Sequence, residues 1–356
     1  MVNRQVVEAL DKMLQDVNEC NLPFGGKVVV LGGDFRQVLP VVPKGKKEGI
    51  IGASLVNSYL WSFFIKIKLI QNMRAILDPS FSNFLLQIGN GTEKHHSCGM
   101  IKLLHNITIP FQDDTLSLNN LIDIVFSNLH YYIQKLDYMI NRVILTPKNE
   151  YVDQINSILI ERFPGDTYKY YSFDEILDKT EQSLQEDFLN TLTPNGIPPH
   201  ELTLKQNCPI MLLRNINPSE GLCNGTRLIC QRFERNVIDA EIAIEEHKGK
   251  RVFFPRIPFV PLESDKNPFP FKRTQFPIRP CFAMTINKSQ GQTLDFVGLY
   301  FPEPVFSHGQ LYVALSRAKT SKSIKILVKP TSNEETHHRC TKNVVYNEIL
   351  YLANSF

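Results

Sequence analysis

The chain has 356 residues, enough for about two to three domains of ordinary size, and 43% of them are hydrophobic, which excludes a wholly disordered protein. Its formal net charge of +3 is too small to identify a partner. Residues 266–329, however, hold ten Lys or Arg against two acids, so this part is either a surface that attracts a polyanion or an ordinary solvated face.

The sequence also argues against a membrane-spanning, secreted or zinc-binding protein. No apolar stretch approaches the ~20 residues of a membrane helix, and the first residues lack an apolar signal core, so we expect the protein to stay inside the cell. The seven cysteines form no C-x-x-C pair, and we expect reduced thiols. Two short His/Cys clusters, at 95–98 and 337–340, lack a second ligand pair at metal-binding spacing, so no metal site is predicted.

In chain order, the first part of the sequence alternates helical and strand patterns. Apolar residues at helical spacing predict a helix over 6–17, which ends at the Pro-Phe-Gly-Gly break. The unbroken run Lys-Val-Val-Val-Leu at 27–31 predicts a strand buried in a parallel sheet. Further elements are predicted in the order helix 54–63, strand 65–70, helix 78–89, helix 116–136, strand 143–146 and helix 148–163.

From about residue 201 the pattern changes to short strands with dense prolines, which predicts a small antiparallel barrel. The strands are expected at 202–205, 210–213, 226–232, 240–244 and 251–255. The alternating pattern then resumes with strand 282–286, a helix from Asn287, strand 296–300, helix 309–318 and strand 323–328. The whole predicts an α/β protein with a barrel inserted in it.

The first candidate site follows the predicted strand at 27–31, because ligands of open α/β sheets bind beyond the carboxyl ends of strands. Gly33 allows close backbone approach, Asp34 and Arg36 offer charges, and Gln37 offers an amide that would orient a water or contact a phosphate oxygen. The alternative is an ordinary strand-to-loop turn with Arg36 facing solvent.

A second candidate, residues 285–293, follows a predicted strand and opens a predicted helix. Its small hydroxyl side chains, Lys288 and the backbone N–H groups of a helix start suit phosphate oxygens of ATP or of a nucleic-acid backbone. It is not a P-loop, since G-x-x-x-x-G-K-[ST] occurs nowhere in the 356 residues. A capped helix with an exposed Lys is the alternative.

Two arginines are further candidates. Arg317, in the last turn of the helix at 309–318, would stabilise a phosphate as a finger, although an Arg there also suits the helix dipole. Arg74 directly follows the strand at 65–70, where a second phosphate contact would fit. Residues 221–228 are a turn-rich entry into a strand, for which a plain hairpin is favoured.

The order of these segments is more specific than any one of them. It runs Leu-x-Gly-Gly-Asp-Phe-Arg-Gln-x-Leu-Pro-Val, Asn-Met-Arg, Leu-Thr-Pro-Lys-Asn, Met-Leu-Leu-Arg-Asn, Gly-Leu-Cys-Asn-Gly-Thr-Arg-Leu, Ala-Met-Thr-Ile-Asn-Lys-Ser-Gln-Gly-Gln-Thr and Gly-Gln-Leu-Tyr-Val-Ala-Leu-Ser-Arg. From about residue 6 to residue 330, this series resembles the petite-integration-frequency (PIF-type) family of superfamily-one 5′-to-3′ DNA helicases. The versions carried by Helitron transposons look nearest.

The resemblance implies an α/β protein of two RecA-like lobes, the first one truncated, with ATP between the lobes and single-stranded DNA across both. It also implies a small SH-three-like β-barrel inserted in the second lobe. The expected parts are the remainder of the first lobe with connecting helices (1–138), the second lobe (139–214 and 281–330), the barrel (215–280) and a C-terminal tail (331–356).

The family's functional positions carry over residue by residue. Gln37 resembles the γ-phosphate sensor, and Arg74 and Arg317 resemble arginine fingers. The positions implied at the nucleotide are Gly33, Asp34, Arg36, Gln290 and Gly291, and those implied at the DNA are Thr285, Asn287, Lys288 and Ser289.

Cofactors, partners and address follow from the resemblance alone. It implies ATP and Mg²⁺ as cofactors, single-stranded DNA and duplex junctions as partners, a monomer, and a nuclear or mitochondrial address. The processes it suggests are DNA repair, recombination, telomere maintenance and Helitron transposition.

The chain departs from the family pattern at its start. In the family, the P-loop and an Asp-Glu-Ala-Pro-Met segment that holds Mg²⁺ precede the helix that begins here near Val6, and Met1 falls about where that segment's Met would stand. We therefore expect roughly the C-terminal two-thirds of a helicase core, inactive alone. The alternative is a decayed, non-catalytic remnant that binds single-stranded DNA without the motor.

Overall fold

The computed structural model describes residues 1–94, 100–177, 186–194, 196–243, 247–261, 270–330 and 339–354. The histidines of both His/Cys clusters lie outside the described residues. The chain divides into two compact units, unit 1 (1–121 and 289–356) and unit 2 (122–288). None of the described helices combines the length and the apolar character that crossing a membrane requires.

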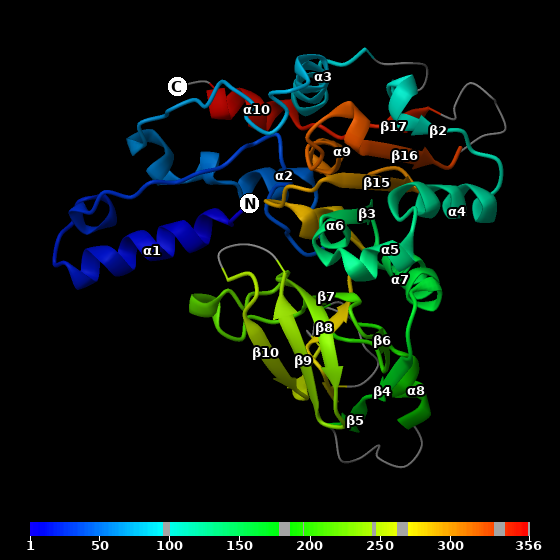
Figure 1. The fold of residues 1–356 in the computed structure, drawn as a ribbon. Helices are drawn as coiled ribbons and strands as arrows, with labels where there is room; N and C mark the ends of the chain where they lie inside the picture. The colour runs from blue at the N-terminus through cyan, green and yellow to red at the C-terminus, as the bar shows by residue number, and fades with distance from the viewer. Residues whose placement is uncertain are drawn as a thin grey trace. The chain divides into compact units, whose positions relative to one another are not determined.

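Unit 1 contains helices from both ends of its sequence, short parallel strands and an antiparallel pair of strands, Met100–Lys102 with Cys340–Lys342 (Figure 1). Its helices are α1 (Arg4–Val17), α2 (Lys47–Gly52), α3 (Pro79–Asn90), α4 (Asp114–Val125, whose last residues belong to unit 2), α9 (Gln310–Leu315) and α10 (Asn347–Asn354). Its strands are β1 (Met100–Lys102), β2 (Thr108–Ile109), β15 (Phe296–Phe301), β16 (Ile324–Val328) and β17 (Cys340–Lys342).

The parallel pairing of β15 with β16, and of β16 with β2, confirms the α/β prediction for unit 1. Parallel neighbours need a crossover connection, and α9 lies in the segment that joins β15 to β16. Every residue of α9 is buried, as are most residues of the two strands. Burial on both faces explains why β15 is a continuous apolar run and why β16 is apolar apart from Lys325.

Unit 2 combines a parallel pair of strands with antiparallel sheets. Its helices are α5 (Leu129–Gln134), α6 (Leu136–Ile140), α7 (Asn149–Arg162) and α8 (Glu186–Thr191). Its strands are β3 (Arg142–Thr146), β4 (Thr167–Tyr171), β5 (Phe173–Ile176), β6 (Glu201–Lys205), β7 (Pro209–Leu212), β8 (Arg227–Phe233), β9 (Val237–Ile242), β10 (Arg251–Pro255), β11 (Ile257–Phe259), β12 (Phe271–Gln275), β13 (Ile278–Pro280) and β14 (Ala283–Thr285).

The short strands predicted after residue 201 are confirmed, with their ends shifted by a few residues. They form an antiparallel sheet in the order β10-β9-β8-β7-β13, and further antiparallel pairs join β11, β12 and β5, and β4 and β6 (Figure 1). β14 pairs in parallel with β3. Four predicted elements of the alternating pattern, at 78–89, 143–146, 148–163 and 323–328, are likewise present as α3, β3, α7 and β16.

Two predicted strands are wrong. Residues 27–31 and 65–70 form no strand, and no described strand pairs with either. Val28 and Val30 are 95% and 89% exposed, and Leu69 is 96% exposed. A strand is stable only where a neighbour takes up its backbone hydrogen bonds, so an apolar β-branched run without such a neighbour stays extended.

Three predicted helices are shorter than expected. The helix from Asn287 is a single 3₁₀ turn at Ile286–Ser289, and Gly291, with a φ of 88°, lies just beyond it. The helix at 54–63 is two 3₁₀ turns, because Ser58 between them is extended. The helix at 116–136 is broken into α4 and α5, and the Asn128 side chain accepts the Tyr131 N–H at the start of α5.

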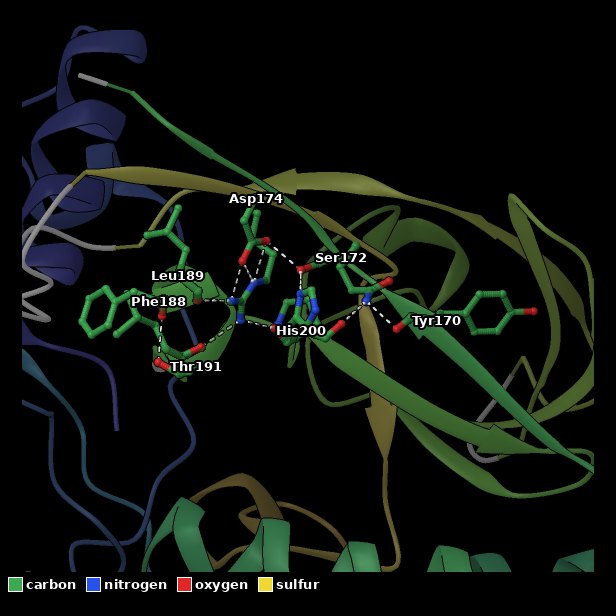
Figure 2. A network of polar contacts seen from close by, with 11 residues as sticks. Tyr170, Ser172, Asp174, Phe188, Leu189, Thr191 and His200 are labelled. Carbon is green, nitrogen blue, oxygen red and sulfur yellow. Dashed lines mark hydrogen bonds and ion pairs between the residues drawn. The ribbon is translucent and has the colours of Figure 1, made fainter. Parts of the chain in front are cut away.

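A fully buried ion pair lies among the antiparallel strands of unit 2 (Figure 2). The Arg273 guanidinium on β12 makes a forked contact with the Asp174 carboxylate on β5, with N–O distances of 2.7–3.1 Å. Its remaining N–H groups donate to the carbonyls of Leu189, Leu192 and Pro198. Every charge here is compensated, so the pair fixes the segment after α8 to the sheet.

Neighbouring polar groups complete the network. The Ser172 hydroxyl donates to Asp174 at 2.6 Å and lies 2.8 Å from Nδ1 of His200 (Figure 2). Since the one hydroxyl proton is used by Asp174, Nδ1 of His200 carries the proton and donates to Ser172. The arrangement orients His200 and is not a catalytic triad, because the carboxylate contacts the serine and not the imidazole.

Candidate functional site

Residues 33–37 form a tight turn in unit 1. The Arg36 N–H donates to the Asp34 carboxylate at 3.0 Å, and the Gln37 N–H donates to the Asp34 carbonyl at 3.0 Å. Nε of Arg36 donates to the side chain of Asn90 at the end of α3, at 2.9 Å. Gly33 has open space where a Cβ would stand, so no contact within the chain requires glycine there.

Gly309, directly before α9, allows the closest approach of this turn to another segment. Its φ is 69°, and a Cβ added there would stand 2.3 Å from the Arg36 carbonyl oxygen. Both the left-handed conformation and the contact require glycine. Sequence reasoning assigned no role to Gly309, although a glycine as the first residue of the predicted helix 309–318 was the signal that could have found it.

His308, the residue before Gly309, holds the same turn through its side chain. Its imidazole is 2% exposed, its Nε2–H donates to the Phe35 carbonyl at 2.7 Å, and its Nδ1 accepts the Tyr346 N–H at 2.8 Å. Burial lowers the pKa of His308 below its usual value, and the Phe35 carbonyl opposes this only in part. The neutral ring therefore joins the turn at 33–37 to the segment before α10.

We expect this contact to make unit 1 sensitive to acid. Because the folded-state pKa of His308 is lowered, its contribution to the free energy of unfolding is present above about pH 6.5 and is lost as the pH falls through the folded-state pKa. Urea unfolding should show a steeper loss of stability between about pH 7 and pH 5 in the wild-type chain than in His308→Gln. Parallel pH profiles of the two proteins would contradict this role.

Arg74 and Arg317 lie side by side in unit 1. Arg74 donates through Nε to the Thr293 hydroxyl at 3.0 Å and through Nη1 to the Ser316 carbonyl at 2.9 Å. Arg317, which was predicted in the last turn of the helix, lies two residues after the end of α9 and donates to the Ser316 hydroxyl at 2.9 Å. Its other N–H groups donate to the carbonyls of residues 289, 292 and 313.

The two guanidiniums form a concentration of positive charge that no described carboxylate neutralises. Arg317 is 1% exposed, and burial, followed by repulsion from Arg74, lowers its pKa to about 10. The pKa of Arg74 is lowered by burial as well. Two adjacent, partly desolvated cations favour a multivalent anion such as a phosphate group. In this arrangement Arg317 donates its hydrogen bonds to groups inside unit 1. To contact a ligand, its side chain has to leave some of these carbonyl acceptors and donate to the ligand instead.

Gln37 and Gln290 are brought together although 253 residues separate them. The Gln290 amide donates to Oε1 of Gln37 at 2.9 Å, which links the first candidate site to the second. Gly291, the next residue, has open space on the side of a missing Cβ. Ser289, which was assigned to the DNA, is fully buried in unit 1.

The other three residues assigned to DNA belong to unit 2. Thr285 is the last residue of β14 and pairs in register with Thr146 of β3. Asn287 is exposed and Lys288 is partly buried. Burial, and then repulsion by Arg279, lowers the pKa of Lys288.

The described residues offer no evident metal site. No group of three or more His, Cys, Asp or Glu side chains in the described part of the chain is arranged to hold a metal ion. Mg²⁺ is bound by carboxylates and phosphate oxygens. We therefore assign Mg²⁺ no role through the described residues.

Two family models match parts of the chain. Residues 1–98 match the model of the PIF1-like helicase, and residues 187–233 match the DNA helicase Pif1, 2B domain. ATP-dependent DNA helicase PIF1 of Danio rerio is 26% identical over 92% of this chain and 45% of its own length. ATP-dependent DNA helicase Pif1 of Bdellovibrio bacteriovorus is 25% identical over 92% of this chain and 64% of its length. The chain thus spans about half to two-thirds of these relatives.

Solved structures with the same fold agree with these matches. Pif1 helicase from Candida albicans superimposes with a TM-score of 0.64 at 20% identity, covering 100% of this chain and 74% of that one. Bacteroides Pif1 bound to single-stranded DNA gives 0.61 at 24% identity, covering 92% and 68%. The α/β fold predicted from the sequence is therefore similar to the RecA-like domains of Pif1 helicases.

Proposed function

We propose that this chain, which family models, sequence relatives and solved structures all connect to the PIF1-like helicases, is the phosphate-sensing and DNA-binding part of an ATP-dependent DNA helicase. In the proposal it translocates 5′ to 3′ on single-stranded DNA and unwinds duplex, as in repair, recombination, telomere maintenance or Helitron transposition. An inserted SH-three-like barrel within 215–280, monomeric action and a nuclear or mitochondrial address belong to the same proposal.

The observation that carries the proposal is the convergence of predicted motifs in unit 1. Arg74 and Arg317 adjoin without a carboxylate partner among the described residues, and Gln37 contacts Gln290. Arginines and a water-positioning Gln are the groups that act on the terminal phosphate of a nucleotide in phosphoryl transfer. When bound, ATP would supply the phosphoryl group whose transfer drives translocation. The chain's own arginines would stabilise its charge, and Gln37 would orient a water.

A second function is favoured by one feature of the sequence. The 356 residues contain no G-x-x-x-x-G-K-[ST] pattern, and phosphoryl transfer needs a phosphate cradle as well as fingers. By themselves these residues would then bind single-stranded DNA without hydrolysing ATP. The proposal of helicase activity accordingly requires a phosphate cradle from outside these 356 residues.

Single-stranded DNA binding tests both forms of the proposal. We expect the chain to bind a labelled oligonucleotide weakly and without sequence preference, and the binding constant to fall steeply with salt because counterions are released. Lys288→Ala should lower both the affinity and the salt slope, measured by fluorescence anisotropy. Lys319→Ala, an exposed side chain paired with Asp295, is the matched control and should change neither. Absent or salt-insensitive binding would contradict the proposed function.

A further inference from the structure

Arg227 and Arg273 of unit 2 are both almost fully buried, but their charges are treated differently. Arg273 is compensated by Asp174 and by three carbonyls (Figure 2). Arg227, the first residue of β8, is 1% exposed and donates to the Arg142 carbonyl over a long 3.4 Å. Its Nε has no hydrogen-bond partner among the described residues. A buried guanidinium with so few partners is costly, and such groups are normally paired.

The thiol that interacts with Arg227 does not neutralise it. Arg227 lies beside the thiol of Cys281, which is also fully buried. Burial raises the pKa of Cys281, so the thiol is protonated at neutral pH and carries no charge to offset the guanidinium. Burial likewise lowers the pKa of Arg227. The pair is thus a cation against a neutral sulfur.

Two more cations lie in the same region of unit 2. Arg227 of β8 and Arg279 of β13 both pair in register with Met211 of β7. The charges of Arg227, Lys288 and Arg279 all act to lower the pKa of Cys281, and Arg279 also repels Lys288. Among the described carboxylates, Asp153 pairs with one of these cations, Arg279, and the Asp153 side chain is 53% exposed. Of these three partly or fully buried cations, only Arg279 therefore has a carboxylate partner among the described residues, and an anionic ligand would relieve the repulsion between them.

We propose that Arg279 and Lys288, backed by the buried Arg227, bind one phosphate group of the single-stranded DNA backbone. The inference rests on the proposed function and adds Arg279 and Arg227, which sequence reasoning did not assign, to Lys288. Arg279, with 15% of its side chain exposed, and the partly buried Lys288 are the groups that a ligand reaches. Arg279 provides the planar fork that suits phosphate oxygens, and Arg227 acts behind it as a positioning charge.

The test compares two substitutions with opposite expected effects. Arg279→Gln should weaken binding of a labelled single-stranded oligonucleotide several-fold and reduce the slope of log K against log salt by about 0.7, the share of one phosphate contact. Asp153→Asn removes the carboxylate that competes for Arg279 and should strengthen binding. Lys169→Gln is the control, because Lys169 also belongs to unit 2 and also pairs with an exposed carboxylate, that of Glu201.

A second arm separates a DNA phosphate from a free phosphate. Thermal unfolding is followed with inorganic phosphate and with chloride at equal ionic strength. If the site takes free phosphate, phosphate will stabilise the wild type but not Arg279→Gln, and DNA binding by Arg279→Gln will equal that of the wild type. That pattern would overturn the assignment to DNA.

The remaining outcomes are also decisive. If Arg279→Gln binds DNA with the affinity and salt slope of the wild type, and the wild type itself binds, this inference is overturned and the proposed function stands. Failure of the unaltered chain to bind would overturn both. Weakened binding by Arg279→Gln together with strengthened binding by Asp153→Asn would support the site, since a purely structural role for the ion pair predicts the same direction for both.

Discussion

Arg273→Met should destabilise unit 2 by about 3–5 kcal/mol, because the substitution leaves the Asp174 carboxylate buried without its cation. Both side chains are almost inaccessible to solvent, so water cannot replace the guanidinium. The carbonyls of Leu189, Leu192 and Pro198 lose their donors as well. The measurement is hydrogen exchange at the amides of β6 and β7, whose protection reports the opening of unit 2 without requiring a two-state unfolding of the whole chain.

Two further variants separate the ion pair from its neighbours. Lys169→Met breaks an exposed pair with Glu201, which solvent screens, and should destabilise unit 2 far less than Arg273→Met does. Asp174→Leu combined with Arg273→Met removes both charges and should recover part of the loss but not all, since the three carbonyls stay without donors. Equal exchange in Arg273→Met and Lys169→Met would show that the buried pair is not what holds the segment after α8.

Elements with a clear apolar pattern of their own could be predicted from the sequence. β15 is a continuous apolar run and β16 is apolar apart from Lys325, because both strands are largely buried, and α7 shows helical spacing between clear boundaries. The apolar run at 27–31 carries the same signal and still forms no strand. The pattern of residues 27–31 indicates that the segment is able to pair with another strand. Whether it does so depends on a neighbouring strand, which the local sequence does not specify.

The candidate site could be predicted as a set of motifs but not as a geometry. Gln37 and Gln290, or Arg74 and Thr293, are hundreds of residues apart, and nothing in either segment specifies the contact. The inward hydrogen bonds of Arg317 were also invisible, because they go to backbone carbonyls that every sequence possesses. No sequence motif marks the buried cations Arg227 and Arg279. Their proposed role is recognised only from the buried surroundings that they share in the structure.

ATP hydrolysis should require more than the residues of this chain. The 356-residue chain alone should not hydrolyse ATP, because Gln37, Arg74 and Arg317 supply charge stabilisation without a phosphate cradle. Fusing a relative's segment that carries the P-loop and the Mg²⁺-binding acids before Met1 should produce DNA-stimulated phosphate release. In this fusion Arg317→Ala should lower turnover by ~10³-fold while single-stranded DNA binding remains, since a finger acts on transition-state charge.

Controls must account for the buried position of Arg317, which makes four hydrogen bonds within unit 1. Arg317→Lys keeps a charge but loses the planar fork, so it should remain folded and still be strongly impaired. Lys319→Ala alters an exposed residue two positions along and should leave turnover unchanged. Robust hydrolysis by the unfused chain would overturn the need for an external cradle. A fusion indifferent to Arg317→Ala would instead show that Arg317 is not a finger.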